Sequence, residues 1–137
     1  MSQKLISSEE EVRNFLLELK EILTDPNFNL GSDLDILLKK KAELSTDPYT
    51  TANTLLALDF DKHDVLNQLL SLETSDYMET FIDNLNSQLP PFFAFAKEIK
   101  SRDVYIKVKI RDRQKQKIFC VSFHFARYPF PQSLPYE

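Results

Sequence analysis

The spacing of apolar residues along the chain changes once, near the two prolines at positions 90 and 91. Before this point apolar residues recur every three or four positions, as they do along one face of a helix. After it apolar and polar residues alternate, which is typical of strands with one buried face. The pattern therefore predicts an α+β fold in which N-terminal helices pack on a small C-terminal antiparallel sheet.

Four helices are expected in the first part of the chain. The first spans 7–23, with Ser7 or Ser8 as its cap and three glutamates in its first turn. A short second helix is predicted over 33–44, where the lysines at 39–41 suit its carboxyl end. A third covers 50–58, and a fourth begins after Asp61 or Asp64. Residues 73–91 are expected to be partly helical and partly an ordered loop.

Three strands follow, over 92–99, 104–111 and 117–126, with a turn at 112–116 and an extended tail from 127. Two sets of alternating residues should share the core face of the last two strands: Val104, Ile106, Val108 and Ile110, and Phe119, Val121, Phe123 and Phe125. One register that satisfies this alternation pairs Arg111 with Ile118, Lys109 with Cys120, Lys107 with Ser122 and Tyr105 with His124.

In that register His124 lies on the polar face, among Tyr105, Lys107, Lys109, Arg111 and Ser122. A histidine moves protons near neutral pH, cations hold a phosphate, and a tyrosine stacks on a base or donates a hydrogen bond. Such a set suits metal-free cleavage of RNA, in which a base activates the 2′-hydroxyl and an acid protonates the leaving oxygen. The alternative is a strand histidine with a structural role, beside a tyrosine that only packs.

Composition limits the other classes of function. The length of 137 residues indicates one domain. Cys120 is the only cysteine, which excludes an internal disulfide and a cysteine-cluster zinc site and suits a reducing cytoplasm. Gly31 is the only glycine, so glycine-rich phosphate loops are excluded and no cofactor is expected.

His63, in an acidic stretch, is interpreted as part of a polar loop rather than as a metal ligand. No signal peptide or membrane-spanning run is expected.

Charge is unevenly distributed. The net charge is −4, yet ten basic and three acidic residues give the segment 97–127 a charge of +7, which leaves −11 for the rest. This segment is either a focused patch that attracts a polyanion or a solvated hairpin whose lysines protect an edge strand.

Four segments in order, 56–77, 92–110, 119–126 and 134–136, resemble the MqsR-family toxins of bacterial type II toxin–antitoxin pairs, most closely their Gram-positive members. The resemblance implies a RelE-like core over 51–137 with a proline-rich tail, and a helical N-terminal elaboration over 1–50. It also implies metal-independent cleavage of mRNA, free or at the ribosome, and an antitoxin protein as partner. No membrane partner is expected, because no apolar run is long enough to span a bilayer.

The family's tyrosine matches Tyr105, and its Ser-Phe-His matches residues 122–124. Glu79 stands where enteric members carry a lysine, and Phe93 or Ala94 where they carry a glutamine. Available cationic substitutes are Lys97, Lys107 and Arg127. The expected catalytic residues are His124, Tyr105 and Lys107, and the expected RNA-binding residues are Lys97, Lys109, Arg111, Ser122 and Arg127.

Two other functions fit the sequence. The chain could be a non-catalytic RelE-fold protein whose basic hairpin binds RNA or an acidic protein partner, which the acidic total charge and Glu79 favour. It could also be a structural helical adaptor with a solvated hairpin.

Overall fold

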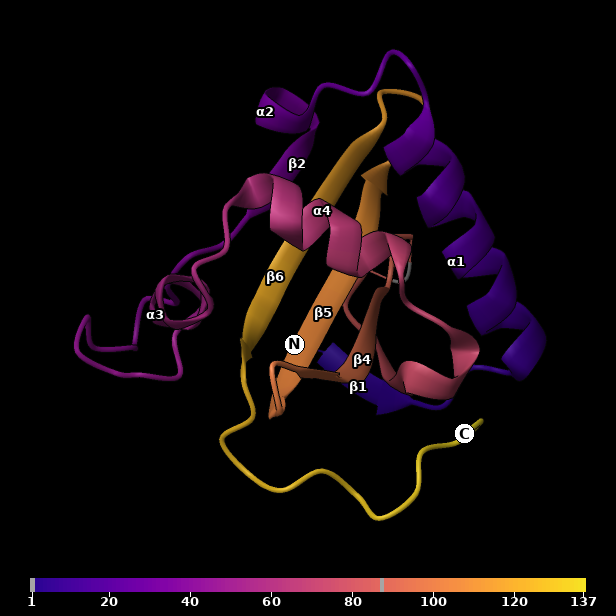
Figure 1. Cartoon of the computed structure of the whole chain (residues 1–137). Helices are drawn as coiled ribbons and strands as arrows, with labels where there is room; N and C mark the ends of the chain where they lie inside the picture. Colours follow the sequence, from indigo (N-terminus) through magenta and orange to yellow (C-terminus); the bar gives the residue numbers. More distant parts are fainter. Residues whose placement is uncertain (1, 87) are drawn as a thin grey trace.

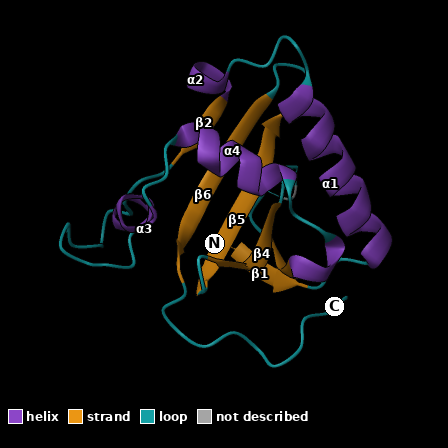
Figure 2. Cartoon of the chain, in the orientation of Figure 1, coloured by secondary structure: helices purple, strands orange, loops and turns teal. Residues whose placement is uncertain are grey.

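A computed structural model describes residues 2–86 and 88–137. The fold is α+β: these residues form helices that pack on a mixed sheet of six strands, in the order β1-β3-β4-β5-β6-β2 (Figures 1 and 2). The elements are β1 (Ser2–Leu5), α1 (Glu9–Thr24), α2 (Leu30–Asp33), β2 (Leu34–Ile36), α3 (Thr51–Leu58), α4 (Lys62–Leu70), a 3₁₀ turn η1 (Thr74–Asp76), β3 (Tyr77–Asp83), β4 (Phe92–Ile99), β5 (Arg102–Asp112) and β6 (Lys117–Phe125). No helix in the described ranges is long and apolar enough to cross a membrane.

Helix α1 forms where the spacing predicts it, because its start is capped and its apolar stripe is buried. The Ser8 hydroxyl accepts the Glu11 N–H at 3.1 Å, and the Glu11 carboxylate accepts the Ser8 N–H at 3.0 Å. The stripe packs on the sheet, where the rings of Phe15 and Phe93 stack with centroids 4.0 Å apart. Helix α4, capped by Asp61, lies across the same face of the sheet (Figure 1).

Helix α3 covers the exposed half of the β6 edge. Strand β2 pairs with β6 only at residues 118–120, so the backbone of β6 beyond this point lacks a neighbouring strand. Two threonine hydroxyls of α3 replace that strand. Thr51 Oγ1 accepts the Phe123 N–H at 3.1 Å, and Thr54 Oγ1 accepts the Phe125 N–H at 3.0 Å.

The predicted helix over 33–44 is wrong. Leu34–Ile36 is strand β2, which pairs in parallel with β6, and the residues after it form a loop of turns. Helix propensity is a weak preference, and here the edge of β6 offers the apolar residues Leu34 and Ile36 a strand to pair with. The lysines at 39–41 therefore cap no helix.

Two further strands were not expected from the sequence. Strand β3 occupies the middle of the segment 73–91, and a register shift between Tyr77 and Glu79 interrupts its alternation. Strand β1 pairs with β3 at the edge of the sheet. Because β2 pairs in parallel with β6, the sheet is mixed rather than purely antiparallel, and β1 and β2 show that part of it comes from residues 1–50.

The register of β5 and β6 is as expected at one end only. Tyr105 pairs with His124 and Lys107 with Ser122, as predicted. A bulge at Val121 then shifts the phase, so that Val108 pairs with Cys120, Lys109 with Phe119 and Ile110 with Ile118. Ile118 and Cys120 consequently lie in the core, and the expectation that Phe119 and Val121 would do so is wrong.

The sheet face turned away from α1 and α4 is called the far face below. By register it carries Lys4, Glu79, Phe81, Phe92, Tyr105, Lys107, Lys109, Phe119, Ser122 and His124. Tyr105, Lys107, Ser122 and His124 thus stay on one face, as the sequence predicts. Beyond the bulge, the aromatic ring of Phe119 joins Lys109 on that face.

Candidate active site

Tyr105 and His124 lie at the centre of the candidate site. They pair directly across β5 and β6, with ring centroids 5.5 Å apart and ring planes at 32°. Both line a cavity of about 380 Å³. Its other walls come from β1, β3 and the start of the C-terminal tail, and they include Lys4, Glu79, Phe81, Arg127, Tyr128 and Phe130.

His124 is placed to act as a base. Its side chain is largely buried, with 9% of the residue exposed, and its Nδ1 lies 3.0 Å from the carbonyl oxygen of Phe125. This partner accepts a hydrogen bond only, so Nδ1 carries the proton in the neutral ring and Nε2 keeps the lone pair. Burial lowers the pKa of His124, and the charges of Lys40 and Arg127 lower it further, against the Phe125 carbonyl and Glu43. The neutral, basic form is therefore favoured.

The pKa of Tyr105 is raised, whereas that of His124 is lowered. Burial is the main cause that raises the pKa of its hydroxyl, and the negative charge of Glu79 adds to it. Tyr105 therefore keeps its proton, which its hydroxyl can offer to a bound ligand in a hydrogen bond. Two neighbouring groups with pKa values moved in opposite directions are typical of acid–base sites.

Lys107 lies one pair further along the same two strands. Its Nζ is 3.7 Å from the centre of the Phe81 ring, and its backbone pairs with Ser122. Burial lowers the pKa of Lys107, as do the charges of Lys40 and Lys4, whereas Glu79 opposes them. A partly desolvated ammonium with a lowered pKa binds a phosphate oxygen strongly and gives up its proton more readily.

The expected RNA-binding residues divide into two groups. Ser122 and Lys109 lie on the far face by register, where Lys109 Nζ is 4.7 Å from the centre of the Phe92 ring, and the Arg111 side chain reaches that face beside Phe119. Arg111 is 4.1 Å from the centre of the Phe119 ring and forms an ion pair with Asp35 at 3.2 Å.

Lys97 and Arg127 are placed differently. Lys97 pairs with Val104, which puts it on the face that α1 and α4 cover, and its Nζ lies 3.6 Å from Asp76. The structure does not bring it to the cavity of His124. Arg127 does line this cavity, but its guanidinium is held by Glu43 at 2.8 Å and Asp47 at 2.7 Å.

Two residues of the site, Lys4 and Lys40, were not assigned to it from the sequence, and Glu79 was named only as an acid at a position where enteric members of the resembled family carry a lysine. Glu79 and Lys4 reach the cavity from β3 and β1, two of the three strands that the sequence did not predict. The aromatic residues Tyr77 and Phe81 on either side of Glu79 were a usable signal for β3, but the bulge hides the alternation. Lys40 reaches Ser122 from the loop after β2, and no local pattern marks it.

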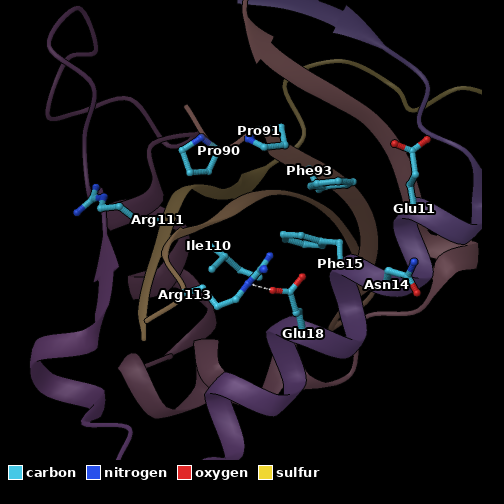
Figure 3. A pocket seen from close by; sticks show the side chains of 10 residues that line it. All are labelled: Glu11, Asn14, Phe15, Glu18, Pro90, Pro91, Phe93, Ile110, Arg111 and Arg113. Carbon is cyan, nitrogen blue, oxygen red and sulfur yellow. Dashed lines mark ion pairs between the residues drawn. The ribbon is translucent and has the colours of Figure 1, made fainter. Parts of the chain in front are cut away.

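A larger cavity, of about 480 Å³, lies on the opposite side of the sheet between α1 and the end of the β3–β4 connection. Figure 3 shows Phe15 and Phe93 in its wall and the ion pair of Glu18 with Arg113 at its rim. Among the residues that the structure describes, its lining contains no histidine, tyrosine, serine or cysteine. It therefore offers less acid–base chemistry than the far face.

Within residues 2–86 and 88–137, no group of three histidine, cysteine or acidic side chains is arranged to hold a metal ion. No protein-family model matches the chain, and a search of curated proteins finds no match to it. The geometry of the far face and the resemblance seen in the sequence are thus what supports a function.

Proposed function

We propose that the chain is a metal-independent endoribonuclease that cleaves mRNA, and that it is the cytoplasmic toxin of a bacterial type II toxin–antitoxin pair with a RelE-like core. The observation that carries the ribonuclease proposal is the Tyr105–His124 pair, which faces the far-face cavity with Lys107 beside it. The toxin role and the antitoxin partner are supported by the sequence resemblance.

The proposed reaction gives each of the three residues one role. His124 Nε2 takes the proton of a ribose 2′-hydroxyl, whose oxygen attacks the adjacent phosphorus in line with the departing 5′-oxygen. Tyr105 donates a hydrogen bond to a non-bridging oxygen of the phosphate, where negative charge develops. Lys107 gives its proton to the 5′-oxygen as the P–O bond breaks. The products are a 2′,3′-cyclic phosphate and a 5′-hydroxyl.

The far face also offers a path for single-stranded RNA. Three cations on it each lie over an aromatic ring, Lys107 over Phe81, Lys109 over Phe92 and Arg111 over Phe119. Cations bind phosphates, and the rings stack on bases that are not paired with a second strand. This arrangement supports a single-stranded substrate whose backbone follows β5.

A second candidate function is RNA binding without cleavage. Glu79 favours it, because an acidic side chain lines the cavity at the position where enteric relatives of the resembled family carry a lysine. A carboxylate there repels a phosphate, whereas the rings and cations further along β5 remain suited to binding.

The test is cleavage of an end-labelled single-stranded RNA in EDTA, with and without translating ribosomes, and with analysis of the product ends. The ribonuclease proposal expects a 2′,3′-cyclic phosphate product that is lost in His124→Ala and reduced in Tyr105→Phe. His63→Ala, at the exposed histidine of α4, should cut like the parent. RNA that is bound but left intact under both conditions would favour the second function. Arrest of bacterial growth on induced expression, relieved by a co-expressed partner, would support the toxin role.

A further inference from the structure

The far face carries a second cavity beside the one that Tyr105 and His124 line. Its volume is about 360 Å³, and Phe81 lines both cavities, so the two adjoin at this ring. Its walls come from β3, β4, β5 and the connection between β3 and β4. Of the residues that line it, only Lys107 takes part in the proposed reaction.

Two lysines of β5 lie against aromatic rings in the wall of this second cavity. Lys107 Nζ is 3.7 Å from the centre of the Phe81 ring and 5.2 Å from that of Phe92. Lys109 Nζ is 4.7 Å from the centre of the Phe92 ring. The negative face of a ring attracts an ammonium group, which holds these flexible side chains in place. Less side-chain entropy is therefore lost when a ligand binds to them.

Both ammonium groups are available to an anion. In the described residues, no carboxylate lies within ion-pair distance of Lys107 or Lys109. Asp83 is the acid in the wall, and one of its oxygens accepts two backbone N–H groups of the turn after β3, at 2.9 and 3.3 Å. Burial lowers the pKa of Lys109, and the charge of Arg111 lowers it further, against Asp83. A phosphate bound at this wall would stabilise the charged form that burial disfavours.

The order of the two cavities sets a direction for the RNA. In the proposed reaction His124 takes the proton of a 2′-hydroxyl, so the nucleotide on the 5′ side of the cleaved bond lies in the first cavity. Lys107 protonates the departing 5′-oxygen, so the nucleotide on the 3′ side lies in the second. Lys109 follows on the same face of β5, about 7 Å further along the strand, which places it at the next phosphate.

We propose that the second cavity is a subsite for the nucleotide on the 3′ side of the cleaved bond, in which Phe81, Phe92 and Leu89 contact the base and Lys109 binds its 3′-phosphate. An apolar wall with a cation at its end suits an unpaired base and the phosphate that its ribose carries. The direction of the RNA rests on the proposed ribonuclease function. Binding of a nucleotide 3′-phosphate in this cavity does not depend on it.

The test compares a ribodinucleotide with and without a phosphate on its terminal 3′-oxygen. We expect this phosphate to raise kcat/KM for cleavage about ten-fold in the parent and less than about two-fold in Lys109→Met. Binding is measured separately with the 2′-O-methyl forms of both ligands, which cannot be cleaved because the 2′-oxygen is blocked. Amide shifts of the ¹⁵N-labelled full chain give the two dissociation constants, and the 3′-phosphate should tighten binding by a similar factor.

Matched ligands and variants control for charge. A dinucleotide with its extra phosphate at the 5′ end has the same charge, and its gain should be equal in the parent and in Lys109→Met. Lys115→Met removes a lysine from the exposed turn of the same hairpin and should keep the gain from the 3′-phosphate, as should Lys109→Arg. An equal gain from the 3′-phosphate in the parent and in Lys109→Met, or an equal loss in Lys115→Met, would overturn the subsite.

The two proposals fail in different ways. A 3′-phosphate that tightens binding of the uncleavable ligand through Lys109, in a protein that cuts no RNA, would keep the subsite and remove the ribonuclease. Cleavage and binding that do not respond to the 3′-phosphate would remove the subsite and keep the ribonuclease. A response to the 5′-phosphate that needs Lys109 would overturn the direction given to the RNA.

Discussion

Tyr105 and His124 face each other across β5 and β6 with ring centroids 5.5 Å apart, and burial moves their pKa values in opposite directions. The pKa of the tyrosine is raised, so it keeps its proton; the pKa of the histidine is lowered, so it stays neutral. The strand pair β5–β6 thus presents a proton acceptor beside a proton donor at neutral pH.

The first prediction concerns the pH dependence of RNA cleavage. His124→Gln should lower the cleavage rate by about 10²-fold or more, because the variant lacks the proposed base. In the parent, the rate should fall on the acid side only below the ordinary histidine pKa of about 6.5, because burial lowers the pKa of His124. Single-turnover rates from pH 4.5 to 8.5 measure both effects. An acid limb centred above pH 6.5 would contradict the role given to His124.

The second prediction concerns stability rather than activity. The pKa of His124 is lower in the folded chain than in the unfolded one, so between these two values the unfolded state binds more protons. Its contribution to the free energy of unfolding is therefore intact above about pH 6.5 and is lost as the pH falls toward the folded pKa. Urea unfolding at pH 7.5 and 5.5 should show a smaller loss for His124→Gln than for the parent. Equal losses would show that folding leaves this histidine unperturbed.

A third prediction tests the bulge at Val121. With uninterrupted alternation Cys120 would lie on the far face, whereas the structure buries it completely. Burial also raises the pKa of the Cys120 thiol to about 12, which leaves almost no reactive thiolate at pH 8. A disulfide reagent should therefore label the native chain very slowly and the urea-unfolded chain at once. Rapid labelling without denaturant would place Cys120 on an accessible face and refute the bulged register.

The fourth prediction concerns the edge of β6. Thr54→Val keeps the shape of the side chain but leaves the Phe125 N–H without its acceptor, and Thr51→Val does the same to Phe123. Each change should lower the free energy of unfolding by roughly 1–3 kcal/mol, because both sites are buried. Thr46→Val, at an exposed loop position, is the control and should cost little. Denaturant curves that match the parent for both buried variants would mean that another group caps this edge.

Much of the fold follows from local patterns in the sequence. Capping residues and apolar spacing identify α1, α3 and α4, aromatic density identifies β4, and alternation identifies β5 and β6. Alternation also places Tyr105 and His124 on one face, because the rule that paired residues share a face holds from the ends of these strands to the bulge. A slip of the register by two residues would keep the same faces, so the sequence allows the direct pairing of Tyr105 with His124 and the structure selects it.

What remained was decided by contacts between distant residues. Leu34–Ile36 becomes a strand because the edge of β6 is free, and Glu79 enters the site because β3 joins the sheet beside β4. Lys40 meets Ser122, and Arg127 meets Glu43 and Asp47, across more than 79 residues of chain in each case. Local periodicity reports which face of an element is apolar and where the element begins and ends. It carries no information on which loop lies over which strand, since that depends on the packing of the whole chain. Only the tertiary structure could therefore show that Lys40 contacts Ser122 and that Arg127 pairs with Glu43 and Asp47.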